Sequence, residues 1–423
     1  MAAQRCYGGR NMSFFADLVS TVFERRYRSA ISKDAVGRSI EDLAQDLLGS
    51  HGEVSGSTLA RLILDRFVEM NTNEKLTFFA FMTHALDIDA REVRDTLKTY
   101  QDAPSKQSYR AFAKASEPAR QELTRRLNQV PGATGQLVAM RKDLLRFLRD
   151  NPTLEPLDVD FQHLFSSWFN RGFLVLRPIN WSSPAEILEK IIEYEAVHAI
   201  DSWDDLRRRL QPSDRRCFGF FHPAMAGEPL IFVEVALTKG IPNSVQDLLA
   251  DGRDPIDAED ADTAVFYSIS NCQAGLAGIS FGNSLIKQVA ADLSRDLPSL
   301  ENFVTLSPIP GLNKWLKAAE PMISPDVCEQ ALAAHYLLEA KRPDGMPFDP
   351  VARFHLGNGA MVHAVHAGAD VSENGMAQSN GAMVNYLYDL SKVTTNHEQF
   401  VAEKIVIASP DVRTLSATVQ SNT

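Results

Sequence analysis

The spacing of apolar residues changes once along this chain of 423 residues, and the change limits the folds open to it. From residue 12 to about 149, apolar residues recur every three or four positions, as at Leu59, Leu62 and Ile63, which predicts amphipathic helices. Beyond residue 155, short runs rich in β-branched and aromatic residues alternate with capped helical segments. The pattern therefore predicts a helical bundle followed by an α+β domain.

The boundary between the two patterns is marked by two prolines, Pro152 and Pro156, which oppose continuation of a helix and suit a connector. We expect a loose N-terminal tail over residues 1–11, a helical domain over 12–155 and an α+β domain over 156–423. The charges of the helical domain are tightly paired along the chain and indicate a solvated face. No group of catalytic side chains stands out there, and such a domain commonly packs against a partner or a second copy.

Composition excludes several classes of protein. Hydrophobic residues make up 44% of the chain and charged residues 23%, which is typical of a soluble globular protein. The net charge of −11 disfavours a general nucleic-acid-binding protein. No apolar run approaches the roughly 18 residues of a membrane-spanning helix, so we expect no membrane partner. The cysteines show no zinc-ligand spacing and are expected to be reduced thiols of a cytoplasmic protein: Cys6, Cys217, Cys272 and Cys328.

A glycine-rich segment joins a β-like run at residues 264–269 to a helical pattern that begins near Ser284. Gly275, Gly278 and Gly282 lie between them. Glycines let a backbone approach a phosphate closely, and a following helix would direct free N–H groups at it. The spacing matches neither the dinucleotide nor the P-loop pattern. A phosphate cradle and a plain strand-to-helix turn both remain open on spacing alone.

Two further positions could carry chemistry. Ser307 follows a β-like run, and Pro308 restricts its backbone, which would give its hydroxyl a fixed direction. On this motif alone, the favoured interpretation is a serine that opens the helix over residues 312–319. His355 lies between apolar neighbours at the head of an expected strand, and its side chain can exchange a proton near neutrality. A lone buried histidine is more often structural, and the competing histidines are His222, His363 and His366.

Together these residues make the chain resemble the malonyl-CoA decarboxylase family. The resemblance covers most of residues 160–395 in order, whereas the helical part matches only in general character. It is carried by the segments Ile179-Asn180-Trp181-Ser182-Ser183-Pro184, Phe221-His222, Gly227-Glu228-Pro229-Leu230, Phe266-Tyr267-Ser268-Ile269, Gly275-Leu276-Ala277-Gly278, Leu306-Ser307-Pro308-Ile309-Pro310-Gly311, Lys314-Trp315-Leu316, Phe354-His355-Leu356, Asn358-Gly359-Ala360, Asn385-Tyr386 and Tyr388.

The resemblance implies an acetyltransferase-like (GNAT) catalytic domain that binds coenzyme A, and a helical domain used in self-association, giving a dimer or tetramer. It implies Ser307, His355 and Tyr388 as catalytic residues and favours the phosphate cradle over the plain turn. Ser280 departs from the family pattern, because animal relatives carry glutamate there. The implied substrate-binding residues are Ser268, Gly275, Gly278, Ser280, Gly282, Asn283 and Ser284.

The implied reaction converts malonyl-CoA to acetyl-CoA and CO2. The thioester carbonyl can itself accept the electrons left by CO2, so we expect no cofactor and no metal. Ser307 and His355 would orient the carboxylate and deliver one proton to the α-carbon, with His355 as the acid. Backbone N–H groups, Ser268 or Tyr388 would stabilise the enolate.

Three other functions fit some of the same residues. A serine and a histidine could form the nucleophile and base of a thioester hydrolase, although Ser307 lacks the G-x-S-x-G elbow. An acyl-CoA acyltransferase would suit the implied fold but needs an acceptor amine or alcohol. A non-catalytic acyl-CoA sensor would bind malonyl-CoA tightly without turning it over.

Overall fold

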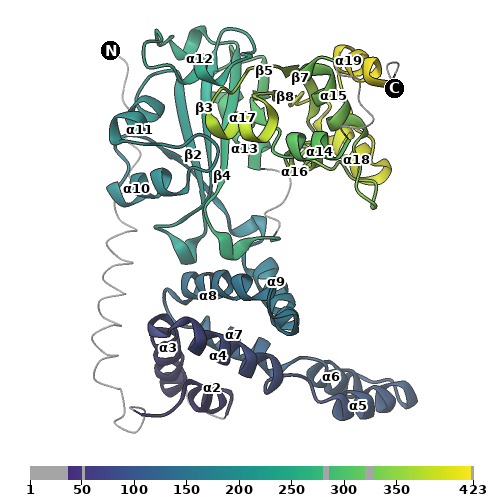
Figure 1. Cartoon of the computed structure of the whole chain (residues 1–423). Helices are drawn as coiled ribbons and strands as arrows, with labels where there is room; N and C mark the ends of the chain where they lie inside the picture. The colour runs from purple at the N-terminus through teal and green to yellow at the C-terminus, as the bar shows by residue number, and fades with distance from the viewer. Residues whose placement is uncertain (1–36, 50–52, 280–284, 320–326, 421–423) are drawn as a thin grey trace. The chain divides into compact units, whose positions relative to one another are not determined.

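The computed structural model describes residues 37–49, 53–279, 285–319 and 327–420 (Figure 1). The chain divides into two compact units. The helical unit runs to Phe169 and also includes Gln273–Ile279, whereas the α+β unit comprises Asn170–Cys272 and the described residues beyond 284. The tail expected over residues 1–11 lies outside the described residues.

The helical unit is built from amphipathic helices whose starts are set by side-chain caps. The Ser39 hydroxyl accepts the Asp42 N–H, and Asn71 with Glu74 forms a capping box. Phe78, Phe79 and Leu137 are fully buried in the core. The helices are α2 (Ile40–Leu48), α3 (Glu53–Glu69), α4 (Thr72–His84), α5 (Ala90–Asp102), α6 (Lys106–Ala115), α7 (Ala119–Leu127), α8 (Ala133–Leu148) and α9 (Glu155–Trp168).

The structure moves the boundary between the units from residue 155 to residue 169. The prolines that suggested a connector begin helices instead: Pro152 starts a short 3-10 turn, and Pro156 lies in the first turn of α9. Proline is tolerated there because the first N–H groups of a helix have no partner within it. The sequence prediction failed because it treated both prolines as helix breakers rather than as helix starts.

The α+β unit contains one mixed sheet, to which the described residues contribute eight strands. β1 to β4 are antiparallel neighbours, and β5 joins β4 in parallel after helix α13 (Leu285–Asp296). β8 pairs with β5, β6 and β7. The strands are β1 (Val175–Ile179), β2 (Arg215–Phe221), β3 (Pro229–Thr238), β4 (Thr263–Asn271), β5 (Asn302–Thr305), β6 (Ser307–Pro308), β7 (Met361–His366) and β8 (Met383–Leu387). The α+β class predicted from the sequence is confirmed.

The two faces of the sheet carry different helices (Figure 1). One face packs on α10 (Ala185–Tyr194), α11 (Trp203–Leu210) and α12 (Val245–Leu249). The other face packs on α13 and on C-terminal helices, and this larger core includes Tyr386 and Tyr388. The C-terminal helices are α14 (Leu312–Ala319), α15 (Glu329–Glu339), α16 (Pro350–Gly357), α17 (Glu373–Ser379), α18 (Val393–Glu403) and α19 (Pro410–Gln420).

The loop that follows β4 is packed within the helical unit. Arg141 of α8 is 1% exposed, pairs with Asp158 at 2.7 Å, and donates hydrogen bonds of 2.8 Å to the carbonyls of Gly275 and Ala277. A Cβ on Gly275 would lie 1.9 Å from the carbonyl oxygen of Val138. Glycine is therefore required at position 275 by the close approach of two backbones.

Substitution of Gly275 should destabilise the protein. We expect Gly275→Ala to lower the free energy of unfolding by about 1–3 kcal/mol, because the backbone of α8 must move to admit the methyl group. Thermal melting followed by circular dichroism measures the change. Gly252→Ala is the matched control, since a Cβ there meets nothing within 4 Å and should leave the melting temperature near that of the wild type. Equal melting of Gly275→Ala and the wild type would contradict the packing described.

Candidate active site

Ser307 is positioned by the pairing of two short strands with β8. Val304 of β5 lies opposite Leu387, and Ser307 of β6 lies opposite Val384. The serine is 5% exposed. A turn through Gly311 then leads into α14, which begins at Leu312. Ser307 therefore lies on the sheet itself rather than at the start of a helix.

His355 lies in helix α16, so the expected strand at this position is wrong. Asp349 caps the helix and Pro350 occupies its first turn, a pair that favours a helix start and could have been recognised from sequence. Strand β7 begins only at Met361, so His355 and His363 do not share a strand face. The imidazole of His355 is buried, with 3% of the residue exposed.

Four side chains form a continuous hydrogen-bonded chain. The Ser307 Oγ lies 3.2 Å from His355 Nε2, and His355 Nδ1 lies 2.8 Å from the Tyr388 hydroxyl. Ser307 also donates its hydroxyl proton to Thr305 Oγ1 at 2.8 Å. The structure thus brings together the three residues that the resemblance implied as catalytic and adds Thr305 to them.

The directions of these bonds assign the tautomer of His355. A serine hydroxyl has one proton, and Ser307 donates it to Thr305, so His355 Nε2 must donate to Ser307. Nδ1 is then the acceptor for the Tyr388 hydroxyl. Burial lowers the pKa of His355 to about 3 and raises the pKa of Tyr388 well above its ordinary value. At neutral pH the imidazole is therefore uncharged and the phenol is protonated.

Strand β8 supplies two residues that the sequence analysis did not place in the site. The ring of Tyr386 stacks on His355, with centroids 4.6 Å apart and an interplanar angle of 23°. The Tyr386 N–H also donates to Thr305 Oγ1 at 3.1 Å, and Asn385 donates to the Thr305 carbonyl at 2.8 Å. The short β8 run was not predicted as a strand, although its apolar and aromatic residues after Gly381 were the available signal.

The remaining candidate residues lie elsewhere. Ser268 of β4 donates to both carboxylate oxygens of Glu195, at 2.9 and 2.7 Å, rather than joining Ser307 and His355. Gly275 and Gly278 belong to the loop within the helical unit, and Gly278 has a φ of +78°, which favours glycine. The other four implied substrate-binding residues lie outside the described residues: Ser280, Gly282, Asn283 and Ser284.

Two of the competing histidines, His222 and His366, have other partners. His222 accepts the Ala224 N–H at the start of a 3-10 turn, and His366 bonds to Asn385. In the described part of the chain, no group of three or more His, Cys, Asp or Glu side chains is arranged to hold a metal ion. No helix among the described residues is long and apolar enough to cross a membrane.

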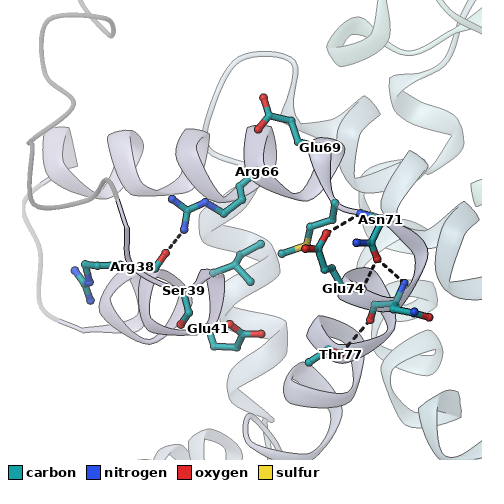
Figure 2. A pocket seen from close by; sticks show the side chains of 11 residues that line it. Arg38, Ser39, Glu41, Arg66, Glu69, Asn71, Glu74 and Thr77 are labelled. Carbon is teal, nitrogen blue, oxygen red and sulfur yellow. Dashed lines mark hydrogen bonds between the residues drawn. The ribbon is translucent and has the colours of Figure 1, made fainter.

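A cavity of about 600 Å³ lies in the helical unit, between α2, α3 and α4 (Figure 2). Arg38 and Arg66 line it together with Glu41, Glu69 and Glu74, so both signs of charge border it. None of its lining residues is a histidine or a cysteine. Ser307 and His355 belong to the other unit, and we assign this cavity no part in the chemistry.

The mixed sheet, with a buried hydroxyl–imidazole–phenol chain beside it, places the protein in the α+β class. Comparison with known proteins gives the family. The profile of the malonyl-CoA decarboxylase C-terminal domain matches residues 172–330 and 326–423, and that of the N-terminal domain matches residues 86–169. The chain belongs to the malonyl-CoA decarboxylase family. The resemblance found in the sequence is confirmed, together with the α+β class.

Individual relatives agree with this assignment. The solved malonyl-CoA decarboxylases of Rhodopseudomonas palustris and Agrobacterium vitis are 46% and 48% identical, with TM-scores of 0.84 and 0.85. Each comparison covers 89% of this chain, and 98% and 99% of the respective relative. The mitochondrial malonyl-CoA decarboxylase of Anser anser anser is 35% identical over 72% of this chain and 71% of its own length.

The low pKa of His355 leads to a prediction that can be tested without measuring activity. Its folded-state pKa, about 3, lies below the ordinary value of 6.5. The stability that neutral His355 contributes is therefore complete above about pH 6.5 and is lost as the pH falls from there toward 3. We expect its imidazole NMR signals, assigned with His355→Gln, to stay constant from pH 5 to pH 8. A titration midpoint near 6.5 would contradict the burial described.

Proposed function

We propose that this chain decarboxylates malonyl-CoA to acetyl-CoA and CO2 through the buried chain of Ser307, His355 and Tyr388. The observation that carries the proposal is their unbroken hydrogen bonding, at 3.2 and 2.8 Å, inside an apolar core. Membership of the family supplies the substrate and the reaction class. Ser307 is the most exposed member of the chain, and we assign it to the malonyl carboxylate and the α-carbon.

The reaction breaks the bond between the α-carbon and the carboxylate. The electron pair moves into the thioester carbonyl, CO2 departs, and an enolate of acetyl-CoA remains. A buried site favours this step because a desolvated carboxylate loses the water that stabilises its charge, while fixed hydrogen-bond donors meet the charge that develops on the enolate oxygen. Since the thioester is the electron acceptor, we propose that the reaction needs neither a metal nor an organic cofactor.

We assign His355 the role of a neutral proton relay. An imidazolium acid is scarce at pH 7 because burial lowers the pKa of His355 to about 3. The Ser307 hydroxyl instead gives its proton to the α-carbon, His355 Nε2–H restores Ser307, and the Tyr388 hydroxyl restores Nδ1. After acetyl-CoA leaves, the two transfers within the enzyme reverse and one proton from solvent returns to Ser307, which restores the starting tautomer of His355. This matches the single proton that the overall reaction consumes.

Nucleotide binding is proposed for the loop that follows β4. Gly278 adopts a left-handed conformation, and glycines let the backbone of such a loop approach a phosphate closely. Hydrolysis of the thioester is the main alternative reaction, because a serine near an imidazole can also act as a nucleophile. The bond from Ser307 to Thr305 favours decarboxylation, since a nucleophilic serine would donate to His355 instead.

Alanine variants of Ser307 and His355 test the proposed mechanism. We expect Ser307→Ala and His355→Ala to lower kcat by about 10²–10⁴-fold, the usual contribution of general acid–base catalysis, with KM for malonyl-CoA less affected. Mass spectrometry of the products formed from malonyl-CoA alone identifies the reaction. Acetyl-CoA and CO2 support decarboxylation, whereas free coenzyme A identifies a hydrolase.

Circular dichroism and acetyl-CoA binding show whether each variant keeps its fold. Wild-type turnover in a folded His355→Ala variant would remove the histidine from the mechanism. Tight binding of malonyl-CoA by the unmodified protein, with no product over hours, would instead indicate a sensor. Activity that survives exhaustive treatment with metal chelators supports the proposed independence of metals, and loss of activity that added metal restores would refute it.

We further propose that the helical unit mediates self-association and that the protein works in the cytoplasm. Every described side chain of α5 is at least partly exposed, although the helix is amphipathic. Ile88, Leu97 and Tyr109 are 41%, 36% and 55% exposed around α5 and α6. Cys217 and Cys272 are buried free thiols, which suits a reducing compartment.

Charged substitutions on this exposed surface test self-association. We expect Leu97→Glu with Tyr109→Glu to reduce the molar mass measured by light scattering from that of a dimer or tetramer to that of one chain, because a buried charge at an apolar contact is costly. Val401→Glu, an exposed apolar position in the α+β unit, serves as the control and should leave the mass unchanged. An unaltered mass in the double variant would place the contact elsewhere.

A further inference from the structure

Asp349 is a completely buried carboxylate just before the helix that carries His355. Its Oδ1 accepts the N–H groups of Val351 and Ala352, both at 2.9 Å, and so caps α16. His355 follows six residues later on the same helix. The position of the imidazole therefore depends on where this cap holds the start of α16.

The second carboxylate oxygen of Asp349 reaches the segment that carries Ser307. Oδ2 accepts the Gly311 N–H at 3.4 Å and the Tyr336 hydroxyl of α15 at 3.4 Å. A Cβ on Gly311 would lie 2.1 Å from the Tyr336 hydroxyl, so only glycine lets this backbone approach. Gly311 is four residues beyond Ser307, at the end of the same proline-stiffened turn.

We propose that Asp349 is a positioning residue, which fixes the separation of Ser307 and His355 by binding the helix start with one oxygen and the serine turn with the other. The proposal rests on the function proposed above and extends it to a residue outside the hydrogen-bonded chain. Asp349 does not itself take part in the proton relay. Its effect reaches the reaction through the 3.2 Å contact between Ser307 Oγ and His355 Nε2.

Two physical arguments favour this role over a simple helix cap. Burying a carboxylate costs free energy unless hydrogen bonds satisfy it, and here four donors from three segments converge on it. A cap alone needs only one oxygen, which the other helix caps of this chain illustrate, for example Asp89 of α5 with a single oxygen. Proton transfer is also sensitive to position, since a displacement of about 1 Å can cost roughly 10²-fold in rate.

Asp349→Asn separates the two functions of the carboxylate. Asparagine keeps one oxygen and is as good a helix cap as aspartate, so α16 should still begin correctly. The amide NH2 that replaces Oδ2 is a donor and faces the Gly311 N–H, which is also a donor, so the turn is pushed away from the helix. We expect kcat to fall about 10–100-fold, with KM for malonyl-CoA within about threefold of the wild type.

Two other variants complete the design. Gly311→Ala disturbs the same contact from the opposite side, by displacing Tyr336, and should also lower kcat. This variant tests the proposal if Asp349→Asn fails to fold. Asp89→Asn makes the same chemical change at a helix cap in the helical unit and should retain wild-type kcat. Melting temperatures and acetyl-CoA affinity are measured for every variant.

The decisive measurement is the effect of Asp349→Asn in a His355→Ala background. If Asp349 acts by positioning, the double variant should be no slower than His355→Ala alone, because the positioned group is gone. A further loss in the double variant, or wild-type kcat in a folded Asp349→Asn or Gly311→Ala variant, would overturn the proposal. Wild-type turnover in His355→Ala would refute the proposed function instead, and this outcome is read from the single variant.

Discussion

The pairing of β8 with three other strands is the constraint on which the site depends. β8 bonds to β5 and β6 on one side and to β7 on the other, and it is buried for most of its length. Through this pairing Ser307 lies opposite Val384, while Tyr386 packs on the imidazole. Tyr388 follows the strand directly, and its N–H bonds to the Phe303 carbonyl of β5. A one-residue slip in this register would turn Tyr386 and the residues beside it to the opposite face of the sheet.

Burial decides the electrostatics of the site more than any neighbouring charge does. Desolvation is the cause of the lowered pKa of His355 and of the raised pKa of Tyr388, and it is also the first cause for Asp349. His355 and Tyr388 are consequently neutral where they touch one another, and their hydrogen bond holds them without an ion pair. Such an environment strengthens interactions with a charge that appears during a reaction, because little solvent is present to screen it.

Much of the architecture could be predicted from local sequence. The apolar spacing indicated the helical unit, and the β-like run at residues 264–269 corresponds to β4. His355 was placed on a strand because its apolar neighbours outweighed the Asp349-Pro350 helix start. Thr305, Tyr386 and Asp349 were missed for a different reason: their importance comes from pairing between segments dozens of residues apart. A local sequence pattern contains no information on such pairing. The resemblance to the family, by contrast, did indicate Ser307, His355 and Tyr388 as candidate site residues.

The loop of Gln273–Ile279 makes the helical unit discontinuous in sequence. During synthesis the N-terminal helices leave the ribosome more than a hundred residues before this loop does, and domains tend to fold as soon as their sequence is available. Until then, the guanidinium of Arg141 has Asp158 as a partner but lacks the two carbonyls that complete its hydrogen bonding. The nascent helical bundle therefore completes the hydrogen bonding of this buried guanidinium only after the first four strands of the sheet have been made.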